Sequence, residues 1–292
     1  MTDLDYVLHE PLPPLRDATM VVMLTGWIDA SGAAAAAMAL LLAGCNSTLL
    51  ATFDSDRYID YRARRPTMEL RDGVNARLVW SDIYVHVGTD QNGHDIVLLS
   101  GPEPDSQWRR FAQVVADLGA QLGVTRMVAV GSYPFAAPHT RVARLSSSSP
   151  SADVSATLPY LKNSVDVPAG AAAALEHAFN DRGIDAMGIW VQVPHYVSTM
   201  PYPAGTLALL SGLREVAEIE IDSTGLATET ADQRIKLDQL VSGNDEHRAM
   251  VQQLEEIYDT SAQQTLSLGH PEVPTGDELA AELERFLRDQ EL

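Results

Sequence analysis

Unbroken runs of apolar residues, each the length of a β-strand, are the feature that most constrains the fold. Residues 18–26, 125–132 and 185–193 are apolar without alternation, a pattern typical of strands covered on both faces. Helical patterns lie between these runs, including an alanine-rich segment that begins near Ser31. Strands that alternate with helices as far as Ile221 predict one α/β domain with a mostly parallel core.

Residues 54–104 have a more polar and alternating pattern, which is typical of half-buried strands. Two hairpin-turn signals interrupt it, Asp72-Gly73 and Asn92-Gly93. The pattern predicts an antiparallel extension of the sheet, followed by a strand at residues 95–101. Residues 146–151, which are rich in serine, form the one low-complexity piece of the sequence, and we expect a loop there.

The last quarter of the chain differs from the rest in charge and in pattern. From Glu215 to Leu292 there are nineteen Asp or Glu residues and five Lys or Arg residues. After Ile221 no strand pattern occurs, whereas amphipathic helical patterns continue and residues 275–278 form a capping box. We therefore expect an α/β core at residues 1–221 and an acidic helical module at residues 222–292.

Charge and cysteine content exclude several classes of function. The formal net charge of −20 at pH 7 repels nucleic-acid phosphates and anionic membrane surfaces. The longest apolar run, residues 33–45, is short of the roughly 20 residues that a membrane span needs. The single cysteine, Cys45, allows no intrachain disulfide, and the opening residues lack the apolar centre of a signal peptide. We expect a cytoplasmic protein that binds neither nucleic acid nor a membrane.

Polar residues follow three of the apolar runs, at the edge where parallel strands end. Asp29 and Ser31 follow the first run, His139 and Arg141 the second, and His195 the third. Ligands of open α/β sheets bind at this edge, and histidine and arginine suit a small anionic ligand. These five residues are a candidate pocket for a ligand or partner. The alternative is structural, because Pro-His also ends strand pairing and the arginine can pair with an aspartate.

The sequence contains none of the motifs GxGxxG, GxxxxGK[ST], GxSxG, HExxH or CxxC. We accordingly assign no catalytic residue, no cofactor and no metal ligand. Residues 57–66 carry the densest positive cluster of this acidic chain, and Arg62, Arg64 and Arg65 within it form a candidate interface. The cluster suits a solvated loop that pairs with the acidic module or with a neighbouring subunit, or else an anion clamp.

Longer segments carry a resemblance that covers nearly the whole chain in the order of a known family. They are GWIDASGAAAAAMALLL, DYRARRP, GSYPFAAPHTR, DAMGIWVQVPHY with PYPAGTLALL, and PTGDELAAELERFLRDQ. In these segments the chain resembles the proteasome assembly chaperone 2-like family, particularly its actinobacterial branch. The resemblance implies a phosphorylase/hydrolase-like fold, which is a three-layer α/β/α domain with a mixed sheet.

The resemblance also implies a function, because eukaryotic relatives help to assemble proteasome α-rings. We expect a non-catalytic, homo-oligomeric interaction protein with a protein partner, for which a proteasome-related protein is one candidate. Some archaeal relatives dock on proteasomes through a C-terminal hydrophobic-Tyr-any tripeptide, whereas this chain ends Gln290-Glu291-Leu292, so that route is not expected. The alternative is a small-molecule-binding protein or a hydrolase/phosphorylase-like enzyme that uses the strand-exit pocket, because such enzymes share the implied fold.

Overall fold

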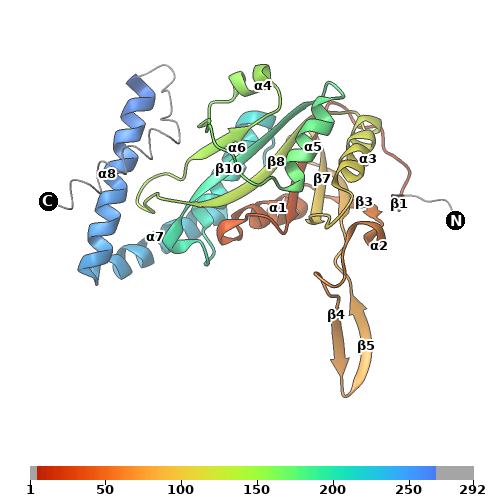
Figure 1. Ribbon diagram of the computed structural model, residues 1–292, viewed down its shortest axis with the longest axis horizontal. Helices are drawn as coiled ribbons and strands as arrows, with labels where there is room; N and C mark the ends of the chain where they lie inside the picture. Colours follow the sequence, from red (N-terminus) through yellow and green to blue (C-terminus); the bar gives the residue numbers. More distant parts are fainter. Residues whose placement is uncertain (1–4, 268–292) are drawn as a thin grey trace.

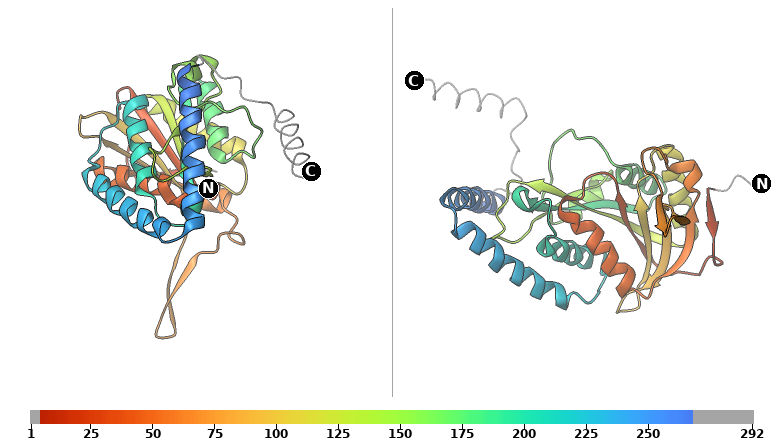
Figure 2. Two further views of the ribbon diagram at one scale, coloured as in Figure 1. Left: turned by 90° about the vertical axis from the view of Figure 1, so that its left-hand side faces the viewer. Right: turned by 90° about the horizontal axis from the view of Figure 1, so that it is seen from below.

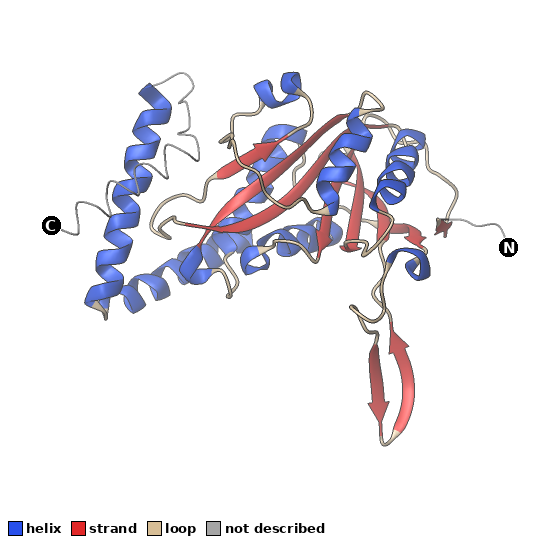
Figure 3. Ribbon diagram, in the orientation of Figure 1, coloured by secondary structure: helices blue, strands red, loops and turns tan. Residues whose placement is uncertain are grey.

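The computed structural model describes residues 5–267, and its centre is an eight-stranded mixed sheet with helices on both faces (Figure 1, Figure 3). In sheet order, the strands are β1 (Tyr6–Leu8), β3 (Thr48–Phe53), β6 (Tyr84–Thr89), β7 (Asp95–Pro102), β2 (Ala18–Thr25), β8 (Val124–Phe135), β10 (Asp185–Pro194) and β9 (Leu145–Ser148). The central strands β7, β2, β8 and β10 are parallel, and the outer pairings are antiparallel. The expected three-layer α/β/α fold is confirmed.

The helices form two layers, which Figure 2 shows on opposite sides of the sheet. One layer consists of α1 (Ala33–Gly44) and α6 (Pro203–Ala217), and the other of α3 (Trp108–Gln121) and α5 (Ala171–Asn180). The shorter elements are α2 (Ser55–Tyr58), α4 (Ala152–Thr157) and the 3-10 turns η1 (Ala30–Gly32) and η2 (His195–Val197).

Alternate residues of the central strands enter two separate cores. Val21 and Val128 pack with α1 and α6, whereas Met20 and Met127 point to the other face and pack with α3 and α5. All four side chains are fully buried. Burial of each such side chain contributes about 1.5–3 kcal/mol to stability. Because both faces of these strands are buried, apolar residues occupy successive positions, and the sequence shows no alternation there.

A separate hairpin, formed by β4 (Thr67–Arg71) and β5 (Val74–Val79), replaces part of the expected extension of the sheet. Only β6 extends the main sheet, antiparallel to β3 and β7. The hairpin turn has positive φ at Asp72 and Gly73, the geometry that an Asp-Gly pair favours. Figures 1 and 2 show that the hairpin projects from the body of the molecule.

The expectation of a loop at residues 146–151 is wrong for its first half, because Leu145–Ser148 forms the edge strand β9, antiparallel to β10. The Ser149 hydroxyl is used within the fold, because its Oγ donates to the Ala186 carbonyl oxygen at 2.8 Å, whereas the buried Ser147 hydroxyl has no hydrogen-bond partner among the described residues. Serine composition favours a loop only when no strand is available for pairing, and the partner strand lies about forty residues later in the sequence.

Two long helices follow the core, α7 (Thr224–Ser242) and α8 (Asp245–Ser267). α7 contacts α6, and α8 stands beyond the strand ends at one end of the molecule (Figure 1). Their apolar faces are partly covered, since Leu237, Val251 and Leu254 are buried. The expected capping box at residues 275–278 lies outside the described residues.

Candidate functional site

Asp29, in the loop between β2 and α1, is the cap of α1. Its carboxylate accepts hydrogen bonds from the backbone N–H groups of Ala34 and Ala35 at 2.9 and 3.1 Å. The Ser132 hydroxyl, which comes from β8, donates to the same carboxylate at 2.6 Å. A helix N-terminus attracts anions, but here an internal carboxylate already fills that position. This helix therefore offers no free site for an external anion.

Ser31 lies beside this cap in a left-handed conformation with φ of 61°. Its backbone N–H donates to the Ser198 carbonyl oxygen at 2.6 Å, which ties the β2–α1 loop to the loop after β10. The hydroxyl oxygen is buried and has no hydrogen-bond partner among the described residues. No base lies within hydrogen-bonding distance of it there, so the structure does not show an activated nucleophile.

His139, in the loop after β8, connects the core to the helical module. Its backbone N–H donates to the Tyr196 hydroxyl oxygen at 2.7 Å, and the same hydroxyl lies 2.7 Å from His139 Nδ1. Burial raises the pKa of Tyr196 to about 12, and in the His139 tautomer with its proton on Nε2 the protonated phenol donates a hydrogen bond to Nδ1. The Nε2–H then donates to the Asp238 carboxylate on α7 at 3.2 Å. Burial also lowers the pKa of His139, in agreement with a neutral ring.

Arg141 holds the same loop to α8. Its Nε and Nη2 donate to the two Asp259 carboxylate oxygens at 2.9 and 2.8 Å, and its Nη1 donates to Glu255 at 3.0 Å. The Thr140 hydroxyl also donates to Glu255. The guanidinium of Arg141 lowers the pKa of Asp259. The structural alternative, an arginine that pairs with an aspartate, is what the structure shows at this position.

Arg144 and Tyr258 complete the contact between the loop and α8. The Arg144 guanidinium lies 3.5 Å from the centre of the Tyr258 ring, and Arg144 Nη2 donates to the Tyr258 carbonyl oxygen at 2.9 Å. The Tyr258 hydroxyl donates to the carbonyl oxygen of Val142 at 2.7 Å. We call residues 139–144, with their partners on α7 and α8, the loop–helix contact.

A cavity of about 580 Å³ lies between the loop after β8, α6 and α7. His139 and Arg141 line it, together with apolar side chains such as Leu145, Leu207 and Leu237. His195 is exposed and does not line this cavity, and neither do Asp29 and Ser31. The structure thus brings two of the five candidate pocket residues into one cavity and uses their polar groups in internal bonds.

The three arginines of the candidate interface lie at the base of the projecting hairpin. Arg64 pairs with Asp105 of the core at 3.0 Å, and its guanidinium lies so close to Gly26 that a Cβ there would stand 2.6 Å from Nη2. Arg62 and Arg65 are exposed and make no ion pair with α7 or α8 in the described part of the chain. A contact of these two arginines with a neighbouring subunit stays a prediction.

Sequence reasoning missed the acidic residues of the loop–helix contact and one buried carboxyl group. Glu255 and Asp259 stand four residues apart on α8, a spacing that places two carboxylates on one helix face and could have suggested a shared arginine. Glu176 on α5 is 5% exposed, and burial raises its pKa to about 7. A lone glutamate on the apolar face of a helix is the signal that could have identified it.

The described residues hold no side-chain cluster typical of a metal site and no helix typical of a membrane span. No group of three or more His, Cys, Asp and Glu side chains among them is arranged to hold a metal ion. In the same part of the chain, none of the helices combines the length and apolar composition that a membrane crossing requires.

Comparisons with known proteins give a consistent result. The PAC2 family model matches residues 23–241. The chain is similar to a Mycobacterium tuberculosis protein of unknown function, with 31% identity and a TM-score of 0.81 over 90% of this chain and 92% of that chain. A proteasome-assembly chaperone homologue from M. tuberculosis has 28% identity and a TM-score of 0.74, over 80% and 99% of the two chains.

A more distant similarity concerns the fold alone. Pyrococcus furiosus PbaB, an archaeal proteasome activator, has 15% identity and a TM-score of 0.62 over 80% of this chain and 97% of that chain. No curated protein sequence matches the chain.

Proposed function

Because the chain belongs to the PAC2 family, whose model matches residues 23–241, we propose that it is a non-catalytic, assembly-chaperone-like protein that binds a protein partner as a homo-oligomer. The similarity to a protein described as a proteasome-assembly chaperone homologue supports a proteasome-related protein as the partner. Such a protein would work in the cytoplasm, in keeping with its acidic charge and single cysteine.

The β4–β5 hairpin is the observation that carries this proposal. It exposes large apolar side chains, each 41–63% exposed: Met68, Leu70, Val74, Leu78, Val79 and Trp80. An isolated two-stranded hairpin is only marginally stable in water, and exposed apolar clusters mark interaction surfaces. A second copy of the chain or a partner that covers the hairpin would stabilise its two strands and would bury its apolar side chains.

The bonding of the strand-exit residues supports a role without catalysis. Asp29 caps a helix, His139 lies between Tyr196 and Asp238, and Arg141 is bound to two carboxylates. A general base or an anion clamp needs a polar group that is free to meet a ligand. Asp29 instead stabilises the start of α1, and His139 and Arg141 fasten the helical module to the core.

The test removes one apolar pair from the hairpin. Met68 and Leu78 face each other across the two strands, so the double variant Met68→Ser/Leu78→Ser removes adjacent apolar side chains. Mass photometry should show a shift toward the monomer, and pull-down from native lysate should recover less of the stoichiometric partner. The matched control is Val165→Ser/Val167→Ser, which changes two equally exposed valines in a loop. A monomeric wild type without a partner would contradict the proposal, as would an unchanged double variant.

A second candidate, a small-molecule-binding protein, is favoured by the cavity of about 580 Å³, whose size suits a ligand. Its apolar walls would select an apolar compound. A metabolite screen by thermal shift should then find a compound that stabilises the protein by about 2.7 kcal/mol at 100 times its Kd. The variant Ala208→Trp, which fills the cavity from α6, should abolish this stabilisation and leave the oligomer intact.

A further inference from the structure

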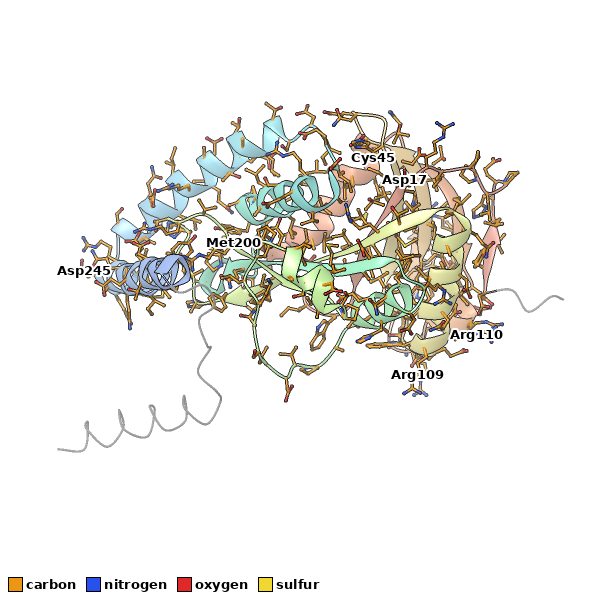
Figure 4. The ribbon with its side chains drawn as sticks, turned by 90° about the horizontal axis from the view of Figure 1, so that it is seen from above. Asp17, Cys45, Arg109, Arg110, Met200 and Asp245 are labelled. Carbon is orange, nitrogen blue, oxygen red and sulfur yellow. The ribbon has the colours of Figure 1, made fainter. Side chains whose placement is uncertain are left out.

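A second cavity, of about 470 Å³, lies at the other edge of the sheet, where the parallel strands begin. It is bounded by Thr19 at the start of β2, by Arg126 at the start of β8 and by Glu218 at the end of α6. Figure 4 shows Asp17, at its rim, toward the end of the molecule opposite Met200 and Asp245. This cavity is therefore separate from the loop–helix contact.

Strand register places Arg126 beneath α6. Arg126 is aligned with Thr19 on one neighbouring strand and with Asp185 on the other. Val128, two residues later on β8, packs with α1 and α6, so Arg126 lies on that same face of the sheet. Its side chain lines both this cavity and a smaller one of about 370 Å³.

Arg126 is partly buried, and its side chain makes no ion pair or hydrogen bond among the described residues. Its Nε is buried without a hydrogen-bond partner. Carboxylates line the same two cavities, including Asp185 and Glu215, yet none forms an ion pair with Arg126 in the described part of the chain. A buried guanidinium N–H without an acceptor is unfavourable, so the side chain is suited to an oxyanion that enters the cavity.

The rim of the cavity carries charges of both signs, because Arg16 lines it together with the carboxylates of Asp17, Asp95 and Glu218. Asp17 and Glu218 both line it, and both have positive φ, at 47° and 58°. Glu218 is the left-handed C-cap of α6, so its carboxylate is placed at the cavity by the end of this helix. The C-terminal end of α6, which carries a partial negative charge, adds to the field of the two carboxylates. The three carboxylates outnumber Arg16, so the rim favours an ammonium group over a second anionic group.

We propose that this cavity binds the zwitterion of a free α-amino acid. Its carboxylate would accept two hydrogen bonds from the Arg126 guanidinium, and its ammonium group would lie between Asp17 and Glu218. The volume is within the range of small-ligand sites and leaves room for a side chain. The site is independent of the proposed assembly role and lies on the face of the sheet opposite α3.

The first experiment titrates the full-length protein with each standard amino acid, using thermal shift and then calorimetry. At least one amino acid should bind saturably. Its amide, which lacks the carboxylate, and its N-acetyl derivative, which lacks the ammonium group, should each bind at least about tenfold more weakly. Failure of every amino acid to bind at millimolar concentration would overturn the proposal. Equal binding of the amide or of the N-acetyl derivative would overturn the assigned zwitterion.

Variants then assign the binding to this cavity. Arg126→Gln should lower the affinity for the amino acid at least about tenfold. Arg109→Gln, which changes an exposed arginine on α3, should leave this affinity unchanged. Glu218→Gln should lower the affinity for the amino acid but not the affinity for its N-acetyl derivative, which has no ammonium group. If Arg126→Gln folds poorly, Arg126→Lys keeps the charge and should bind several-fold more weakly, because lysine lacks the bidentate fork. Unchanged affinity in a folded Arg126 variant would overturn the site.

Discussion

Glu176 is a buried carboxyl group whose protonation affects the stability of the fold. It accepts weak hydrogen bonds from the Ser148 hydroxyl at 3.2 and 3.3 Å, and no ion pair involves it among the described residues. Burial raises its pKa to about 7, well above the ordinary 4.5. Between these two values the unfolded chain is charged while the folded chain stays protonated. The free energy of unfolding therefore falls as pH rises from 4.5 to 7 and is constant above 7.

Glu176→Gln should remove this pH dependence, because the amide fits the same space without a charge. A shift of this size corresponds to roughly 3 kcal/mol at pH 8, and urea denaturation should show the variant to be more stable there. At pH 4.5 and below, the two proteins should differ little. The same stability difference at pH 4.5 and pH 8 would show that Glu176 is not the group responsible.

Asp29 makes a second residue-scale prediction, because its carboxylate satisfies two amides of α1. Asp29→Ala should lower the free energy of unfolding by about 1–2 kcal/mol, the usual effect of losing a helix cap. In this variant the Ser132 hydroxyl would still donate to the Ala30 carbonyl oxygen, which lies 2.7 Å away, so it would not be left without an acceptor. The control is Ser31→Ala, which removes a hydroxyl without a partner and should be nearly neutral. Equal destabilisation by both variants in chemical denaturation would reject the assignment.

At the scale of elements, the loop–helix contact holds α8 against the core. Arg141 binds Asp259 through both carboxylate oxygens, and the short turn at Gly243 and Asn244 connects α8 to α7. Loss of the arginine should leave α8 held by fewer contacts and increase its movement about this turn. We therefore expect proteinase K to cleave Arg141→Ala within residues 242–245 several-fold faster than the wild type.

The control for this experiment is Arg110→Ala, which removes a comparable bidentate pair with Asp5 from a distant part of the core. Mass spectrometry of the first fragments identifies the cut. Early cleavage within β8 in either protein would contradict the proposed division at residue 221. The other cleavage region that the sequence suggests, residues 268–274, lies outside the described residues.

The sequence predicted the elements better than it predicted their contacts. The buried strands β2, β8 and β10 follow from apolar runs, and α1 follows from the alanine-rich segment that begins near Ser31, all of which are local signals. The strand β9 was missed, because an edge strand with serine side chains depends on pairing with a distant segment. His139 and Arg141 were correctly placed at the strand exit, but their acidic partners lie about a hundred residues away, where no local pattern indicates them.

At the scale of the whole molecule, positive and negative surfaces lie far apart. The hairpin base carries Arg62 and Arg65, whereas α7 and α8 together carry eight Asp or Glu residues and three Lys or Arg residues, and Figure 1 shows the hairpin and α8 at different ends of the body. These surfaces do not meet within one chain. They could meet between two chains, in an arrangement where the hairpin of one subunit reaches the acidic helices of the next. Such a contact would combine the apolar hairpin surface with charge complementarity.

The double variant Arg62→Ala/Arg65→Ala tests this arrangement and leaves the Arg64–Asp105 pair intact. Exposed ion pairs contribute about 0–1 kcal/mol each, so loss of both arginines from one contact should raise the subunit dissociation constant by roughly thirtyfold at most. Light scattering over a dilution series should show this shift at low salt. Raising the salt concentration should weaken the wild-type oligomer in the same way, because screening removes the attraction. Arg109→Ala removes an equally exposed arginine from α3 and should leave the oligomer unchanged. If the double variant and the wild type dissociate identically at every salt concentration, Arg62 and Arg65 do not contribute to assembly, and the apolar hairpin surface alone must account for it.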